Sequence, residues 1–368
     1  HLFVRDGVGI AGRGVAARVS AEHAVDALAA IEHDDGVGGV RPIALGVVPF
    51  VPGTPTSLVI PAVTVGKDAD GRRWVTIVDD SPLADELVTG SRPAPRAQEF
   101  TVRPLTPVDR YLTAVTAARD AVRAGALTKA VIAREVEVRS PDPIDVHAVL
   151  LRLKATFGRS HRYSIDGFIG ASPELLVEVK GHTVRSHPLA GTTPRTGDPD
   201  TDRRAAAELL ASEKNQIEHR VVIDMIHDTL LPWCSYLDWE PEPSIVTVAN
   251  VQHLATDVTG ELVDGAPVLA LAASLHPTAA VCGTPSERAK AVIRELEGLD
   301  RGRYSGPVGW TDSNGDGEFG IALRCAQIEA DNQLRLFAGC GIVAGSDSAA
   351  EVAESDAKFA AMQTALNG

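Results

Sequence analysis

The alternation of apolar and polar residues divides the chain into short strands and several helices. Strand patterns occur at residues 44–50, 57–65, 74–78, 128–138, 163–169, 175–179, 183–187, 318–328 and 333–338, with further strand segments between 245 and 262. Turn pairs such as Asp70-Gly71 and Lys180-Gly181 join strands that are neighbours in sequence. Such strands pair antiparallel, so the pattern predicts an α+β fold of layered, mostly antiparallel β-sheets with helices packed on the outside.

Apolar residues at helical spacing predict the helices. They cover residues 21–31, 107–124, 145–157, 205–231, 266–275, 285–296 and 349–366. Ser20 is a suitable N-cap for the first helix, and Pro107 is a suitable first residue for the second. The pattern over 205–231 predicts one continuous helix, and the polar residues 79–100 predict a surface connection.

The composition is that of an ordinary globular protein, with 44% hydrophobic and 23% charged residues in a chain of 368. No apolar run reaches the length of a membrane span, and a net charge of −14 argues against nucleic acid or an acidic membrane surface as a partner. The four cysteines form no Cys-x-x-Cys pair, which favours free thiols in a cytoplasmic protein. We expect a single domain over residues 1–368, preceded by further residues before His1.

Lysine is scarce in this chain, which has seven lysines among 35 basic residues. One of them, Lys129, belongs to the predicted strand 128–138 and shares a face with Val131 and Ala133. Burial on that face would favour the neutral amine, a usable base, whereas an arginine stays charged. The alternative is a lysine at a strand end that reaches solvent.

Several carboxylates are candidates for acid chemistry and metal binding. A buried Glu174 would have a raised pKa and could donate a proton near neutrality. Glu218 and the pair Glu351/Glu354 belong to two different predicted helices, and carboxylates from two helices can hold Mg²⁺ when the substrate completes the shell. Taken singly, each is better explained as a solvated residue or as part of an ion pair such as Glu354–Lys358. Residues 339–341 could present backbone amides to a carboxylate, or form a turn.

Eight motifs that occur in a fixed order favour the catalytic and metal-binding roles of these residues over the alternatives. They are Ala171-Ser-Pro-Glu-Leu-Leu, Pro188-Leu-Ala-Gly-Thr, Ser212-Glu-Lys-x-x-x-Glu-His, Val251-x-His-Leu, Leu275-His-Pro-Thr, Val308-Gly-Trp with Ile321-Ala-Leu-Arg, Ala338-Gly-x-Gly-Ile-Val, and Glu351-x-x-Glu-x-x-x-Lys. The set resembles the chorismate-utilising enzymes, which include isochorismate, salicylate, anthranilate and aminodeoxychorismate synthases. The resemblance covers about residues 106–366, the chorismate-binding core, and is less distinct over residues 1–100.

Three positions distinguish branches of that family. Ala190 stands where aminodeoxychorismate synthases carry a nucleophilic lysine, and Ala280 stands where pyruvate-releasing and aminating branches carry threonine or serine. Lys129 matches the water-activating base that the ammonia-using branch lacks. All three positions resemble those of isochorismate synthases.

The resemblance implies a Mg²⁺-dependent isomerisation of chorismate to isochorismate. Lys129 would deprotonate the water that attacks ring position two, and Glu174 would protonate the hydroxyl that leaves position four. Glu218, Glu351 and Glu354 would hold the metal against the ring carboxylate. The implied substrate-binding residues are Ala190, Gly191, Thr192, His253, Ala280, Arg324, Gly339, Gly341 and Lys358. Arg324 is matched to the enolpyruvyl carboxylate and His253 to the ring substituents.

The resemblance also implies a monomer without a glutaminase subunit. Three alternatives remain open from the sequence: a salicylate synthase that continues to salicylate and pyruvate, an anthranilate synthase component, and a non-catalytic chorismate-binding protein. The pathway supplied is also open between menaquinone, a catechol siderophore and a salicylate-derived siderophore.

Overall fold

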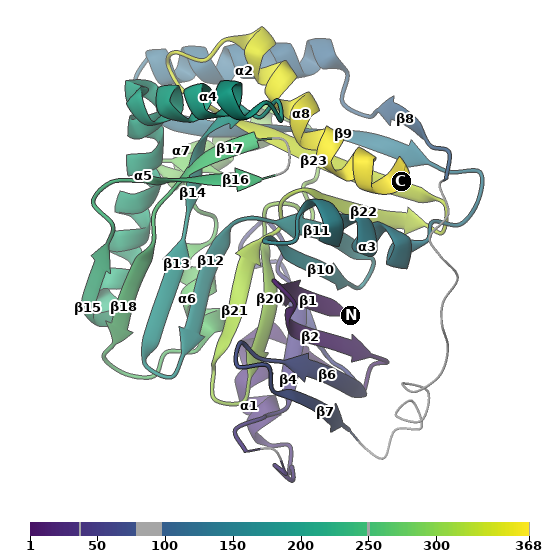
Figure 1. The fold of residues 1–368 in the computed structure, drawn as a ribbon. Helices are drawn as coiled ribbons and strands as arrows, with labels where there is room; N and C mark the ends of the chain where they lie inside the picture. The colour runs from purple at the N-terminus through teal and green to yellow at the C-terminus, as the bar shows by residue number, and fades with distance from the viewer. Residues whose placement is uncertain (37, 79–97, 249–250, 368) are drawn as a thin grey trace.

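Two large sheets pack against each other in the computed structural model, which describes residues 1–36, 38–78, 98–248 and 251–367 (Figure 1). The first sheet has the order β19 (Gly283–Thr284), β9 (Lys129–Arg139), β23 (Gln333–Ile342), β22 (Cys325–Ala330), β11 (Phe168–Ser172), β10 (His161–Ile165), β1 (Leu2–Arg5), β2 (Val8–Arg13), β6 (Val63–Lys67) and β7 (Arg73–Ile77), and β8 (Thr101–Pro104) also pairs with β9. Residues 79–97 of the predicted connection at 79–100 lie outside the described residues.

The second sheet has the order β15 (Cys234–Trp239), β18 (Val258–Leu262), β13 (Thr183–His187), β12 (Leu175–Lys180), β21 (Gly317–Ile321), β20 (Pro307–Asp312), β4 (Ile43–Val47), β5 (Ser57–Ile60) and β3 (Ala17–Ser20). A small third sheet joins β14 (Leu189–Pro194), β17 (Val251–Ala255) and β16 (Ser244–Val248). All strand pairs in the described residues are antiparallel. Phe3, Leu45, Tyr163 and Phe337 belong to the apolar core shared by the two large sheets.

Helices cover the outer faces of these sheets. They are α1 (Ala24–Ala29), α2 (Val108–Arg123), α3 (Val146–Thr156), α4 (Pro199–Ala211), α5 (Glu213–Leu230), α6 (Val268–Leu275), α7 (Ser286–Leu296) and α8 (Ser348–Asn367). One core joins α3 and α8 to the first sheet, and another joins α5 and α6 to the second. Figure 1 shows α8 crossing β23 and β9. The predicted α+β class is therefore confirmed.

The predicted helix over residues 205–231 is wrong, because two helices meet at Ser212. This residue has an extended backbone (φ −73°, ψ 107°), and its side chain accepts a hydrogen bond from the Asn215 amide. A serine in this conformation satisfies one of the unpaired N–H groups that begin a helix, so it starts α5 instead of continuing α4. Helix α5 carries Glu218 against β14.

Three predicted strands are each divided into two. Pro61 separates β5 from β6, and a turn at Asp166-Gly167 with φ of 48° and 73° separates β10 from β11. Arg324, with φ of 47°, lies between β21 and β22. The Ser20 side chain makes no cap hydrogen bond, and residues 21–23 form a 3₁₀ turn before α1.

Of the two interpretations of residues 339–341, the turn is wrong, and the presentation of backbone amides to a carboxylate stays a prediction. Strand β23 continues to Ile342, and Gly339 and Gly341 pair with Ala133 and Val131 of β9. Within the described residues, no helix is long and apolar enough to cross a membrane.

Candidate active site

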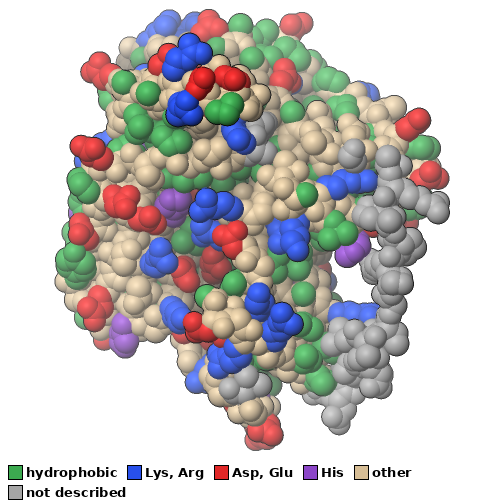
Figure 2. Space-filling model, viewed as in Figure 1, with side chains coloured by type: hydrophobic (Ala, Val, Ile, Leu, Met, Phe, Trp, Pro, Cys, Tyr) green, Lys and Arg blue, Asp and Glu red, His purple; other side chains and the backbone are tan. Residues whose placement is uncertain are grey.

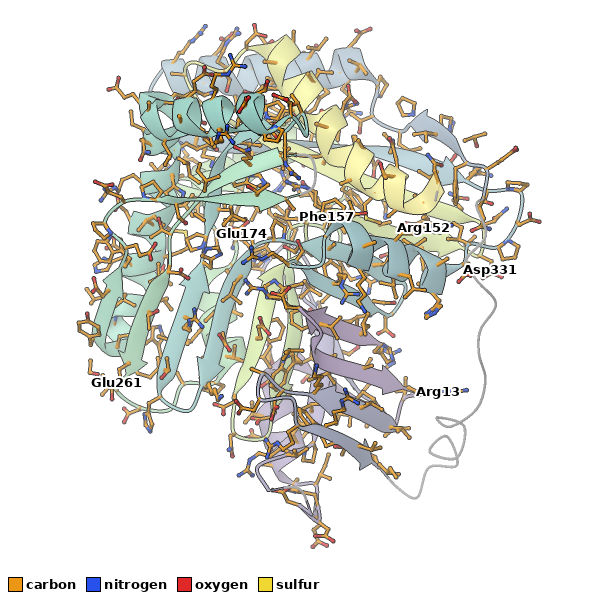
Figure 3. The ribbon with its side chains drawn as sticks, in the orientation of Figure 1. Arg13, Arg152, Phe157, Glu174, Glu261 and Asp331 are labelled. Atoms are coloured by element: carbon orange, nitrogen blue, oxygen red, sulfur yellow. The ribbon has the colours of Figure 1, made fainter. Side chains whose placement is uncertain are left out.

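One pocket collects nearly all of the predicted site residues. It is lined by Lys129, Glu174, Ala190, Gly191, Thr192, Glu218, His253, Ala280, Arg324, Gly339, Gly341, Glu354 and Lys358. Glu351 is the one predicted residue that does not line it. The lining comes from β9 and β23 of the first large sheet, from the small sheet, from α5 and α8, and from connecting segments at residues 173–174, 280–281, 304 and 323–324. Figure 3 shows Glu174 at the centre of the molecule, between β11 and β12.

Lys129 is buried in the pocket and forms an ion pair with α5. It is 2% exposed, and its Nζ lies 2.8 Å from Glu218 Oε1. Of the two possibilities that the sequence left open for this lysine, the structure shows burial and excludes a side chain that reaches solvent. Gly341 makes room for the pair, because a Cβ at that position would lie 2.6 Å from Glu218 Oε1 and 2.7 Å from Lys129 Cε.

Glu174 is a buried carboxyl group with few partners. It is 3% exposed, and its Oε1 accepts a hydrogen bond of 3.3 Å from the Leu189 amide. Burial raises the pKa of Glu174 to about 7, against the opposing effects of the Leu189 amide, Lys129 and Arg324. The carboxyl group is thus close to half protonated at neutral pH, as a general acid requires.

Three side chains that are linked by hydrogen bonds form a polar wall of the pocket. Arg324 donates to His253 Nε2 over 3.2 Å, and His253 Nδ1 lies 3.0 Å from Thr192 Oγ1. Because an arginine can only donate, we assign Nε2 as the acceptor and Nδ1 as the protonated nitrogen that donates to Thr192. Burial, together with Arg324 and Lys358, holds the pKa of His253 well below its usual value, so the ring is neutral. Gly191, with φ of 77°, provides the bulge between Ala190 and Thr192.

Arg324 keeps binding capacity toward the pocket. It is buried, and its Nε has no partner among the described residues. An unpartnered buried guanidinium N–H is unfavourable by itself and is well suited to a carboxylate ligand.

Lys358, which lines the pocket, connects α8 to β23 through hydrogen bonds. Its Nζ donates to the Gly339 carbonyl over 2.7 Å and to Glu354 Oε1 over 2.6 Å. Burial alone would raise the pKa of Glu354, but the Lys358 ammonium holds it below its usual value. Glu354 is therefore ionised at neutral pH.

Glu351 and Glu354 form the part of the site that fits a cation. Their carboxylates and Cys340 Sγ offer ligand atoms within 4.8 Å of one another. Burial and the neighbouring Glu354 raise the pKa of Glu351 to about 7, the mark of two carboxylates that lack sufficient positive charge. Their hard oxygens suit Mg²⁺. Burial raises the pKa of the Cys340 thiol well above its usual value, so this soft, protonated group does not suit it.

Glu218 does not belong to that group of ligand atoms in the described part of the chain. Its nearest cationic partner is Lys129, while Lys214 Nζ lies 3.9 Å from Glu351 Oε1. Of the three carboxylates expected to form one cluster, Glu351 and Glu354 therefore lie together, whereas Glu218 is paired with Lys129.

The sequence did not single out several residues that line the pocket. They are Val131, Pro173, Leu189, Val281, Tyr304, Leu323, Phe337 and Ala338. The buried Tyr304 stacks on Phe337 with ring centroids 5.2 Å apart. These residues lacked a signal because buried apolar and aromatic positions of a site resemble those of any core. On the face drawn in Figure 2, acidic and basic side chains are interspersed.

The matching family model is that of the chorismate binding enzymes, and it matches residues 61–367. The chain therefore belongs to the chorismate binding enzyme family, as its eight motifs predicted. It is 37% identical over 341 residues to isochorismate synthase DhbC of Bacillus subtilis, covering 89% of this chain and 82% of that protein. It is 36% identical over 349 residues to isochorismate synthase EntC of Escherichia coli, covering 91% of this chain and 84% of that one. The structure of MenF, the menaquinone-specific isochorismate synthase of Escherichia coli, superposes with a TM-score of 0.84 at 26% identity, covering 99% of this chain and 87% of that one.

Proposed function

We propose that this chain is an isochorismate synthase that converts chorismate to isochorismate. Relatives named for this activity match about nine tenths of the chain, which supports the assignment. The observation that carries the mechanism is the pocket itself, because it unites a buried amine with a buried carboxyl group that is protonated near neutrality.

Lys129 acts as the base and Glu174 as the acid. Lys129, once it has released its ammonium proton, takes a proton from a water molecule, whose oxygen forms a bond to ring carbon two. The ring double bonds shift, the bond from carbon four to its hydroxyl oxygen breaks, and Glu174 gives its proton to that oxygen, which leaves as water. One water is consumed and one is released, so product and substrate are isomers. Paired proton transfers avoid a free hydroxide as nucleophile or leaving group.

The polar walls of the pocket orient the substrate. Arg324, with its unpartnered Nε, binds the enolpyruvyl carboxylate, and the neutral His253 ring fixed by Thr192 contacts the ring substituents. Gly191, Gly339 and Lys358 line the pocket, and we assign them to the side that receives the ring carboxylate. Two carboxylates bound at fixed points hold the ring in one orientation toward the acid and the base.

Glu354 and Glu351, with Glu218, would hold Mg²⁺ beside the ring carboxylate. When bound, the metal supplies the positive charge that offsets the repulsion between a dianionic substrate and these carboxylates. Because water is the nucleophile, the reaction needs no ammonia-supplying glutaminase subunit, and we expect a monomer. Ala280 in the pocket wall supports release at the isochorismate stage.

The test is an incubation of the protein with chorismate, with and without Mg²⁺, followed by chromatography and proton NMR. We expect isochorismate in a stable mixture with chorismate, dependent on Mg²⁺ and lost in Lys129→Ala. Lys290→Ala is the control, because Lys290 pairs with the exposed Glu287. Salicylate plus pyruvate as main products would overturn the assignment in favour of a lyase, and unchanged chorismate would overturn the enzyme assignment itself.

A further inference from the structure

One buried ion pair outside the proposed catalytic set contacts the walls of the pocket. Glu297 and Arg301 are each 3% exposed. Arg301 Nε donates to Glu297 Oε2 over 2.9 Å, and Arg301 Nη2 donates to Glu297 Oε1. Burying two charges carries a large desolvation cost, so the pair calls for an explanation beyond its own attraction.

The pair completes an edge of β9. On this edge β19 pairs with residues 129–130 and β8 pairs with residues 136–139, which leaves a gap between them. In the gap, Arg301 Nη2 donates to the Val131 carbonyl over 2.8 Å, and Glu297 Oε1 accepts from the Ala133 amide over 2.7 Å. Two side chains thus take the place of a missing strand and satisfy backbone groups that would otherwise be buried without partners.

The same guanidinium also holds the segment that carries Ala280. Arg301 Nη1 donates to the Val281 carbonyl over 2.8 Å. Both Ala280 and Val281 line the pocket, as do Lys129 and Val131 on β9. The guanidinium lies over the Phe50 ring, 4.2 Å from its centroid, which fixes its plane. Arg301 therefore bridges two pocket walls, the Val131 wall and the Val281 wall, at a point beyond the end of the β19–β9 ladder.

We propose that Arg301, held by Glu297, is a positioning residue that sets the separation between the Ala280 wall and the Lys129 strand. It thereby controls how chorismate lies against the base and how strictly the reaction stops at isochorismate. A lysine cannot replace it, because a single ammonium lacks the rigid fork of donors that reaches two carbonyls and a carboxylate together. This inference rests on the proposed isochorismate synthase activity of the same pocket.

The experiment compares Arg301→Lys with a matched control, Arg303→Lys. Arg303 belongs to the same loop and also donates to two backbone carbonyls, those of Ile165 and Asp166. Neither of these two residues lines the pocket, whereas Val131 and Val281, which accept from Arg301, both do. Steady-state kinetics, the pyruvate released per isochorismate formed, and thermal unfolding are measured for each protein. For Arg301→Lys we expect kcat/KM to fall on the order of tenfold and the pyruvate share to rise. For Arg303→Lys we expect both to stay within about twofold of the parent.

The pyruvate share separates positioning from general stability, since a merely structural role would lower the melting temperature and leave the products unchanged. Should Arg301→Lys fail to fold, Glu297→Gln replaces it, because it keeps an acceptor for the Ala133 amide and removes only the ion pair. An unchanged product ratio and kcat/KM in the folded variant, or equal changes in the Arg303→Lys control, would overturn the inference. A parent protein that forms no isochorismate would instead overturn the proposed function.

Discussion

Lys129 Nζ lies 2.8 Å from Glu218 Oε1, and the two partners differ in their access to water. The lysine side chain is 2% exposed and the glutamate side chain 13%. Lys129 begins β9 and Glu218 belongs to α5, so the pair joins a sheet to a helix that is distant in sequence. The loss of stability should therefore depend on which of the two partners is removed.

We predict that Glu218→Met destabilises the protein more than Lys129→Met. The first change leaves an ammonium buried without a partner, a cost of about 3 kcal/mol. The second leaves a carboxylate that still reaches water, so its cost is smaller. Urea unfolding of both variants measures the difference, and a greater loss in Lys129→Met would contradict the prediction. Lys129→Met should also have no detectable isochorismate formation.

Gly341→Ala tests how closely this pair is packed. The new Cβ would meet the ends of two flexible side chains, Glu218 and Lys129, which can move without disturbing the backbone. We therefore predict a folded protein whose unfolding free energy changes little, but whose kcat/KM falls about a hundredfold because the base is displaced.

Gly265→Ala is the matched control for that variant, since its added Cβ would have no atom within 4 Å. It should keep full activity. A Gly341→Ala protein as active as the Gly265→Ala control would show that the Lys129–Glu218 geometry does not limit the reaction.

Much of this arrangement could be predicted from the sequence, since local chemistry encodes it. The antiparallel class followed from strands separated by turn pairs, and the β12–β13 hairpin formed around Lys180-Gly181 as expected. The family resemblance identified thirteen residues that line a single pocket, of which eleven belong to the eight motifs and two, Lys129 and Ala280, do not. The motifs did not reveal which side chains from different elements contact each other. They did not show, for example, that Lys129 is buried and paired with Glu218.

Other features had no sequence signal. Glu297 and Arg301 are four residues apart, a spacing that usually indicates an ion pair on a helix surface, and only the tertiary structure shows that they fill a gap in β9. Ser212 resembled any polar residue of an amphipathic helix, although it ends one helix and caps the next. Gly339 and Gly341 resembled turn residues, yet they lie in a strand where a side chain would enter the pocket.

The pKa of Glu174 predicts a pH dependence. Burial raises it to about 7, so the carboxyl group is protonated below that pH and loses its proton above it. We expect kcat/KM to fall as the pH rises through about 7, because this profile reports the free enzyme. In the kcat profile the same fall should lie at higher pH, since the dianionic substrate disfavours ionisation of the carboxyl group. Stopped assays across a pH series measure both, and equal inflections in the two profiles would contradict the assignment to Glu174.

The pKa of Glu351 predicts that Mg²⁺ binding releases protons. This carboxyl group, with a pKa raised to about 7 by burial and by Glu354, must ionise before it can act as a ligand. We expect Mg²⁺ to bind more tightly at about pH 8 than at about pH 6, with heats that depend on the ionisation enthalpy of the buffer. Calorimetric titrations of Mg²⁺ in two buffers, without chorismate, separate proton release from binding. In Glu351→Gln the buffer dependence should disappear, whereas Glu287→Gln, on an exposed helix face, should keep it. Proton release that persists in Glu351→Gln would place the titrating group elsewhere and would contradict a role for Glu351 in metal binding.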